Sequence, residues 1–109
     1  MNNVKRFKER KKKEFGDLNF TIYFESDRIT SGIASIPAGG KGKLDKGHPE
    51  AEEVFTVSSG SIVVSFPDTG NKFELGYGDA VLIPVGVPHI VENHGKEDAV
   101  FMFSLAPKL

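Results

Sequence analysis

Turns that contain glycine or proline interrupt this chain every ~8–12 residues, which leaves room only for short strands between them. The turns are Ser59-Gly60, Pro67–Gly70, Gly76–Asp79, Pro84–Gly86 and Asn93–Gly95. Most of the segments between turns are rich in β-branched and aromatic residues, which favour strands. The predicted strands are 20–24, 28–36, 53–58, 61–66, 72–75, 80–83, 89–93 and 99–105. No long segment keeps a helical apolar period, so the pattern predicts an all-β sandwich or barrel.

Length and composition narrow the class of protein further. A chain of 109 residues is expected to form one domain. It has no cysteine, which excludes disulfide bonds and thiolate zinc sites. No apolar run approaches the ~20 residues that a membrane span needs, and no apolar segment of a secretory signal follows the basic N-terminus. We therefore expect a cytoplasmic protein without a membrane partner.

The first fifteen residues form a basic arm that differs from the rest of the chain. Residues 1–14 contain seven lysines and arginines against two glutamates, although the whole chain has a formal net charge of −1. Such an arm is either a solvated terminus or a tether to nucleic acid or another acidic surface. Few aromatic residues interleave with it, so base stacking is poorly supported and we do not expect a nucleic-acid partner. The predicted organisation is an arm at 1–15 and one β-barrel domain at 16–109.

Strand alternation places two of three potential metal ligands on the inner face of the barrel. If Glu53 faces inward, the next two inward positions of its strand are apolar, as a core requires. If His89 faces inward, so do Val91 and Asn93, whereas His94 falls on the opposite face and inside a turn. Histidine and carboxylate are metal-ligand types. We therefore expect the fold to bring His48, Glu53 and His89 together.

Two spaced motifs resemble those of the cupin superfamily. The first is matched by Gly40, Lys46, His48, Glu53 and Gly60, with a lysine where the family has its first histidine. The second is matched at every position by Gly78, Pro84, Gly86, His89 and Asn93. Two motifs in order, at the right separation, form a specific signal. The resemblance covers residues 30–105.

The resemblance implies a double-stranded β-helix, or jelly-roll barrel, with a metal inside it. Cupins usually hold iron, manganese, nickel, copper or zinc with three histidines and one glutamate. By this resemblance His48, Glu53 and His89 are the metal ligands. The ammonium of Lys46 has no lone pair to give, so Lys46 is expected to bind an anionic substrate beside an open metal position. The remaining ligands are those of a facial triad, which suits Fe(II).

Two functions follow from this set of residues. The first is a metal-dependent enzyme, such as a dioxygenase, isomerase or lyase, that acts on a small anionic molecule. The alternative is a non-catalytic cupin that binds a sugar or a carboxylate and has a degraded metal site. The catalytic residues, the substrate and the metal identity stay open. A homodimer is expected, because the apolar segment Phe20–Phe24 is interpreted as an edge strand that needs covering and small cupins often pair this way.

Overall fold

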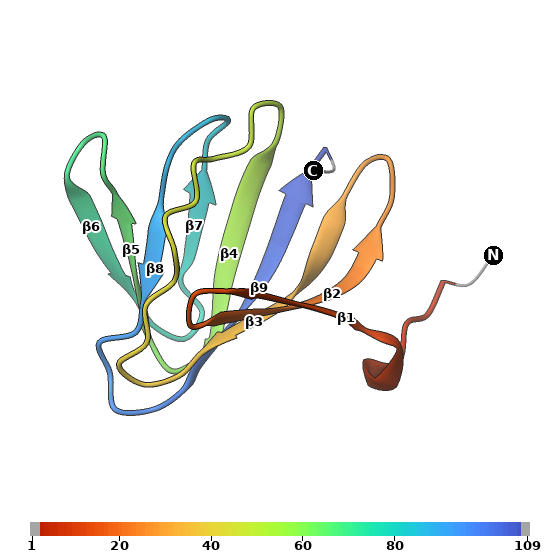
Figure 1. Ribbon diagram of the computed structural model, residues 1–109, viewed down its shortest axis with the longest axis horizontal. Helices are drawn as coiled ribbons and strands as arrows, with labels where there is room; N and C mark the ends of the chain where they lie inside the picture. The colour runs from red at the N-terminus through yellow and green to blue at the C-terminus, as the bar shows by residue number, and fades with distance from the viewer. Residues whose placement is uncertain (1–2, 108–109) are drawn as a thin grey trace.

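The computed structural model describes residues 3–107, and these fold almost entirely into antiparallel strands (Figure 1). One short 3-10 turn, η1 (Phe7–Glu9), precedes the strands. The strands are β1 (Lys11–Phe15), β2 (Leu18–Glu25), β3 (Thr30–Ile36), β4 (Glu52–Ser59), β5 (Ile62–Phe66), β6 (Asn71–Leu75), β7 (Ala80–Ile83), β8 (Ile90–Glu92) and β9 (Ala99–Ala106). They form a six-stranded sheet in the order β1-β2-β3-β9-β4-β7 and a three-stranded sheet in the order β6-β5-β8. The prediction of an all-β jelly roll is confirmed.

The eight predicted strands all form, with ends that shift by one or two residues. The exception to the sequence-based assignment is β1, which lies inside the expected basic arm. Its residues pair with β2 from Lys11↔Ile22 to Phe15↔Leu18. Four of its five residues are exposed, so its composition resembles that of a solvated terminus. Residues 1–2 and 108–109, the outer ends of the expected arm and barrel domain, lie outside the described residues.

The core lies between the two sheets and explains why buried and exposed residues alternate along β4. On β4 the residues Glu53, Phe55 and Val57 are buried and their neighbours are more exposed. The Phe55 ring packs on Phe101 of β9 with centroids 4.7 Å apart. Every residue of β5 is buried. Apolar burial of this kind contributes about 25 cal/mol per Å² of surface removed from water, and it fixes the register of the strands.

Strand β1 covers one side of β2 and also reaches the loop that leads to the site. The turn after β1 contacts this loop through two hydrogen bonds, in which the Asp17 amide donates to the Lys41 carbonyl at 3.0 Å and the Lys41 amide donates to Asp17 Oδ2 at 3.0 Å. Because β2 has β1 on one side and β3 on the other, it is not an edge strand. The edge-strand reason for expecting a homodimer is therefore wrong, and the homodimer itself stays a prediction.

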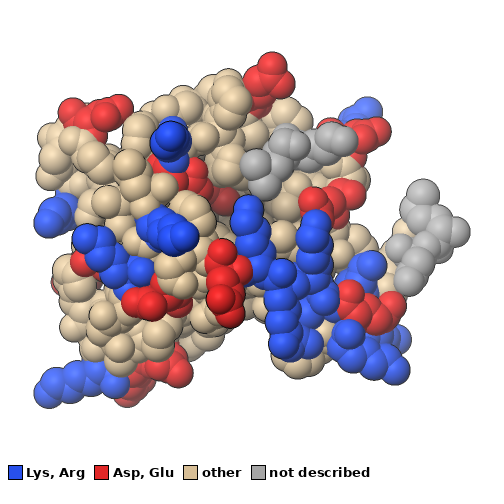
Figure 2. All heavy atoms as spheres, viewed as in Figure 1, with Lys and Arg blue, Asp and Glu red and all other residues tan. Residues whose placement is uncertain are grey.

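The charged surface follows the same arrangement. Figure 2 shows lysine and arginine side chains gathered over the part of this face that β1 occupies in Figure 1. Arg10 lies over the Phe7 ring, with its guanidinium carbon 3.6 Å from the ring centroid. Lys11 pairs with Glu25 of β2 at 3.3 Å. The described part of the basic arm is thus ordered against the barrel. No helix among residues 3–107 is long and apolar enough to cross a membrane.

Candidate metal centre

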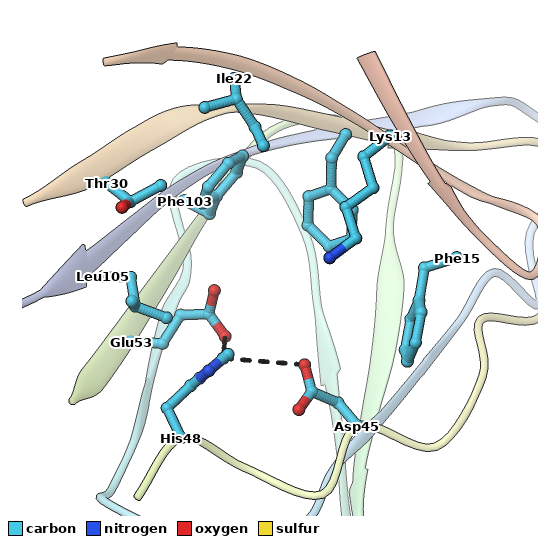
Figure 3. A pocket seen from close by; sticks show the side chains of 10 residues that line it. Lys13, Phe15, Ile22, Thr30, Asp45, His48, Glu53, Phe103 and Leu105 are labelled. Carbon is cyan, nitrogen blue, oxygen red and sulfur yellow. Dashed lines mark ion pairs between the residues drawn. The ribbon is translucent and has the colours of Figure 1, made fainter. Parts of the chain in front are cut away.

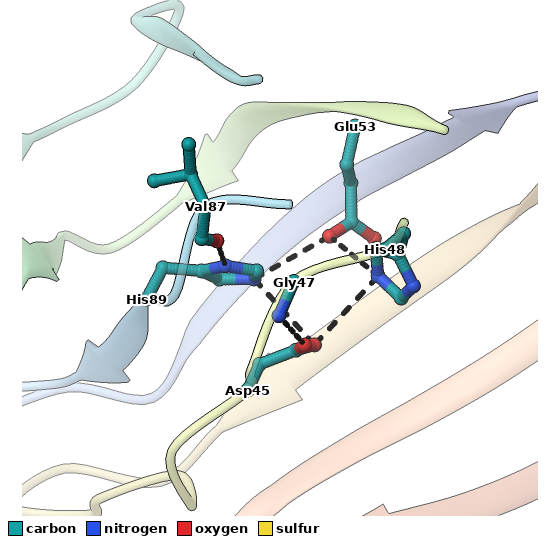
Figure 4. Close-up of polar contacts among 6 residues, drawn as sticks. All are labelled: Asp45, Gly47, His48, Glu53, Val87 and His89. Carbon is teal, nitrogen blue, oxygen red and sulfur yellow. Dashed lines mark hydrogen bonds and ion pairs between the residues drawn. The ribbon is translucent and has the colours of Figure 1, made fainter. Parts of the chain in front are cut away.

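Four side chains from three parts of the chain meet at one end of the barrel (Figure 4). Glu53 lies near the start of β4, His89 lies just before β8, and Asp45 and His48 come from the loop before β4. Asp45 Oδ2 lies 3.8 Å from His48 Nε2 and 3.5 Å from His89 Nε2. Glu53 Oε1 lies 3.6 Å from His48 Nε2 and 3.5 Å from His89 Nε2. The structure thus brings His48, Glu53 and His89 together, as the sequence led us to expect.

Asp45 is the member of the cluster that sequence reasoning missed. Its backbone pairs with that of His89, with each amide donating to the other's carbonyl at 2.9 Å. The Gly47 amide donates to Asp45 Oδ1 at 2.9 Å, which leaves Oδ2 to face the two imidazoles. Gly47 has a φ of +90°, and a Cβ added there would lie 2.6 Å from the backbone carbon of Gly86. Only glycine fits this turn, which lets Asp45 and His48 face the same point.

Lys46 lies one residue away from Asp45 but has a different environment. Its side chain is exposed, and it is not among the residues that line the cavity beside the cluster. The role given to Lys46 by the family resemblance therefore stays a prediction without geometric support. One sequence signal could have identified Asp45: it is a carboxylate directly before Lys46, the position of the family's first histidine. A shift of one residue along an extended segment turns the neighbouring side chain to the opposite face. His94, which we left out of the site, is exposed and contacts Glu92 at 3.0 Å.

The orientation of the His89 ring suits a metal ligand. Its Nδ1 lies 3.0 Å from the Val87 carbonyl, and a carbonyl can only accept, so Nδ1 carries the proton. In the neutral ring Nε2 then has a free lone pair directed at Asp45 and Glu53. This kind of support, a backbone carbonyl behind a histidine, holds metal ligands in other proteins. His89 is 2% exposed and packs edge-on against Phe55.

The cluster couples the charges of its members. Contact with Glu53 raises the pKa of His48 above its usual value, with the nearby charge of Asp45 adding to the effect. Burial lowers the pKa of His89, but Glu53, the Val87 carbonyl and Asp45 outweigh it and the net pKa is raised. Burial likewise raises the pKa of Glu53, and the two histidines reverse this, so its net pKa is lowered. Two carboxylates thus stabilise positive charge at this point.

The donor set fits a divalent transition metal. Glu53 is 5% exposed, and its Oε1 has no hydrogen-bond partner among the described residues, which is costly for a buried carboxylate. Two donors that each lie about 2.1 Å from one ion are about 3.0–4.2 Å apart, depending on the angle between them. The contacts of 3.5–3.8 Å in the cluster fall in this range. The ligand atoms of Asp45, His48 and Glu53 lie within 4.8 Å of one another, and His89 stands outside this group of three but lies 3.5 Å from both carboxylates.

A cavity of about 80 Å³ opens beside the cluster (Figure 3). Its walls combine the cluster with residues of β1, β2, β3 and β9; they are Lys13, Phe15, Phe20, Ile22, Thr30, Asp45, His48, Glu53, Phe103 and Leu105. Most of the wall away from the cluster is apolar. Lys13 and Thr30 are the two polar residues of that wall, and no sequence motif pointed to either of them. The arrangement can hold a cation at the cluster and a small, partly apolar molecule next to it.

Comparisons with known proteins agree with the fold and with the motifs. A family model described as "Cupin domain" matches residues 32–105. "Germin-like protein 11-1" from Oryza sativa subsp. japonica is 40% identical over 55 residues, which are 48% of this chain and 25% of that protein. "Uncharacterized protein MJ1618" from Methanocaldococcus jannaschii is 36% identical over 62 residues, 57% of this chain and 47% of that protein. The chain thus spans between a quarter and about half of these two relatives.

Solved structures show the same barrel at low sequence identity. KdgF from Halomonas sp. superposes with a TM-score of 0.82 at 16% identity and covers 100% of this chain and 96% of that one. A predicted oxalate decarboxylase from Thermotoga maritima superposes with a TM-score of 0.79 at 17% identity, covering 95% and 98%. At these identities the likeness establishes the fold. Together with the family match over residues 32–105, it shows that this chain belongs to the cupin family.

Proposed function

We propose that this cupin binds one divalent transition metal through Asp45, His48, Glu53 and His89, and a small anionic molecule in the adjacent cavity. The observation that carries the proposal is the buried Oε1 of Glu53, which has no hydrogen-bond partner among the described residues. It is buried between the Nε2 atoms of His48 and His89 at 3.6 and 3.5 Å. A cation shared by these donors would satisfy the buried oxygen and use both histidine lone pairs.

The proposed activity is that of a metal-dependent dioxygenase, isomerase or lyase. A metal bound here would supply a Lewis acid that polarises an oxygen of the bound molecule. The chain itself would hold the molecule in an apolar cavity and orient His89 through the Val87 carbonyl. The metal is one of iron, manganese, nickel, zinc and copper. We place the protein in the cytoplasm and expect it to act as a homodimer.

A non-catalytic binding protein is the second candidate. The two histidines and two carboxylates already lie 3.5–3.8 Å apart, and with protonated imidazoles they would neutralise one another without a cation. The raised pKa of both histidines favours this state. In that case the apolar cavity alone would bind a small carboxylate or sugar-like molecule. The two functions differ in whether the isolated protein retains a metal.

Metal content separates the candidates directly. We expect protein purified without added metal or chelator to contain about one transition-metal ion per chain. The metal-free protein should rebind Mn(II), Fe(II), Ni(II) or Zn(II) in isothermal titration. His89→Ala should weaken this binding at least tenfold, which corresponds to about 1.4 kcal/mol. His94→Ala is the matched control and should not, because His94 is exposed and pairs with Glu92. If the protein neither retains nor rebinds a metal, the result would favour the second candidate function, the non-catalytic binding protein.

A further inference from the structure

We propose that Lys13 and Thr30 recognise the two ends of a short hydroxycarboxylate in the cavity, Lys13 contacting its carboxylate and Thr30 its hydroxyl. This inference rests on the proposed function, because it concerns the molecule that lies beside the metal. Figure 3 shows the two side chains entering the cavity from different walls, with the cluster of Asp45, His48 and Glu53 below them. Lys13 comes from β1 and Thr30 from the start of β3.

Thr30 provides an unused hydrogen-bonding group that is buried in the wall of the cavity. The residue is 1% exposed, and its Oγ1 has no hydrogen-bond partner among the described residues. A buried hydroxyl without a partner destabilises the fold, so an ordinary core position would favour valine. Its neighbours in the wall include Ile22, Phe103 and Leu105, none of which offers a polar side chain. A hydroxyl of a bound molecule would satisfy this atom.

Lys13 provides the positive charge of the cavity. It is the sole lysine or arginine among the described residues that line the space. Its neighbour on the same face of β1, Lys11, pairs with Glu25 at 3.3 Å, whereas Lys13 forms no ion pair within residues 3–107. In Figure 3 its ammonium nitrogen points into the space above Asp45. The β1–β2 pairing, Lys13↔Phe20, holds it at this rim.

Charge balance explains why such a lysine is needed. The carboxylates of Asp45 and Glu53 together offset the two positive charges of a divalent cation, so the loaded cluster has no net charge to attract an anion. A set with three histidines and one carboxylate would keep one positive charge. In this chain the attraction for an anionic molecule must come from Lys13, and one lysine suits one carboxylate.

The size and walls of the cavity limit the rest of the molecule. One water needs about 10–15 Å³ of such space, so a cavity of about 80 Å³ has room for roughly five to eight water-sized groups. The Phe20 and Phe103 rings pack edge to face with centroids 5.2 Å apart and line the middle of the cavity. An aliphatic chain of a few carbons fits this surface. A carboxylate and a hydroxyl at its two ends complete the match.

Three probes separate the two contacts, all measured by calorimetric titration of the metal-loaded protein. They are 4-hydroxybutyrate, butyrate, which lacks the hydroxyl, and 4-hydroxybutyramide, which lacks the charge. Lys13→Met should weaken both carboxylates about tenfold and leave the amide unchanged, because a hydrogen bond to a charged group is lost. Thr30→Val should weaken 4-hydroxybutyrate and the amide about fivefold and leave butyrate unchanged.

Matched controls come from the outer face of the same hairpin. Lys12→Met and Thr21→Val change the same residue types at paired positions of β1 and β2 that do not line the cavity, so neither should alter any affinity. The proposal is overturned if wild-type protein binds none of the probes, if Lys13→Met lowers all three affinities equally, or if Thr30→Val lowers butyrate binding. Metal titrations of the same variants should match wild type. If wild-type protein fails to bind metal, the proposed function fails instead.

Discussion

Replacing Asp45 with asparagine tests the ligand that the sequence did not indicate. Asparagine keeps the shape of the side chain and an oxygen that can accept the hydrogen bond of the Gly47 amide. In the wild-type protein this amide donates to Asp45 Oδ1 at 2.9 Å. It removes the negative charge that lies 3.5 Å from His89 Nε2 and 3.8 Å from His48 Nε2. The backbone pairing between residues 45 and 89 is unaffected by the side chain. The change is therefore local to the cluster.

The magnitude follows from the number of ligands and from the charge. Loss of a partner that only supports a metal ligand typically costs about 10–100-fold in affinity. In the proposed site Asp45 would supply a ligand atom and half of the negative charge of the cluster, so we expect a loss of about 100-fold, or about 2.7 kcal/mol. The charge of Asp45 also helps to raise the pKa of both histidines, so these pKa values should fall in the metal-free variant.

Isothermal titration with Mn(II) and Zn(II) measures the affinity, and NMR titration of the histidine ring protons measures the pKa values. Glu92→Gln is a matched control, since Glu92 contacts His94 at 3.0 Å on the surface and lies outside the cluster. Lys46→Met is a second control, because the Lys46 side chain is exposed and does not line the cavity. An Asp45→Asn affinity within about threefold of wild type, or an equal loss in Lys46→Met, would refute the four-ligand site.

Three further predictions concern pH, the turn and the oligomer. Metal affinity should fall as pH decreases through the raised pKa values of His48 and His89, because the proton competes with the metal for Nε2. In the metal-free protein the raised pKa values contribute stability that is fully present below pH 6.5 and is lost as pH rises through those values. Calorimetry at a series of pH values checks both predictions. Gly47→Ala should lower stability by about 1–3 kcal/mol in urea denaturation and weaken metal binding, because its φ is +90° and an added Cβ would meet the backbone of Gly86. Gly70→Ala is the control that separates these two causes, because Gly70 also has a positive φ but nothing lies near its Cβ position. Met102→Glu should convert a homodimer into monomers in sedimentation without changing metal affinity, because Met102 is exposed and pairs with exposed Ile33 on the outer face of the large sheet; a wild-type protein that sediments only as an 11.9 kDa species would contradict the dimer.

The fold could be predicted from the sequence because each level of the pattern agreed with the next. Turn residues bounded segments of strand length, and the apolar positions of 53–58 alternated as a half-buried strand requires. β1 could not be predicted in this way. It consists mostly of lysines and glutamate, and its outer residues face water. Its place in the sheet depends on pairing with β2 and on the contacts of its turn with Lys41, which are tertiary features.

The candidate site was predictable only in part. His48, Glu53 and His89 occupy motif positions, Glu53 and His89 also fit the strand alternation, and the three do come together. Asp45 lies in a loop, where no period fixes which of two neighbouring residues turns inward. Its position depends on the pairing with His89 and on the left-handed turn at Gly47. The motif pointed to Lys46 instead. Spacing alone does not show that the residue one position earlier, Asp45, is the one that turns toward the cluster.

The aspartate changes the chemical character of the site as well as its charge. Two imidazoles and two carboxylates give as many oxygen donors as nitrogen donors, whereas three histidines and one glutamate give an excess of nitrogen. Carboxylate oxygen suits harder cations, and imidazole suits zinc, copper, iron and nickel. Relative to a three-histidine set, the proposed site of Asp45, His48, Glu53 and His89 would therefore favour manganese more and copper less. It would do so while cancelling the charge of the ion, and recognition of an anion would then fall to Lys13, which β1 places at the rim.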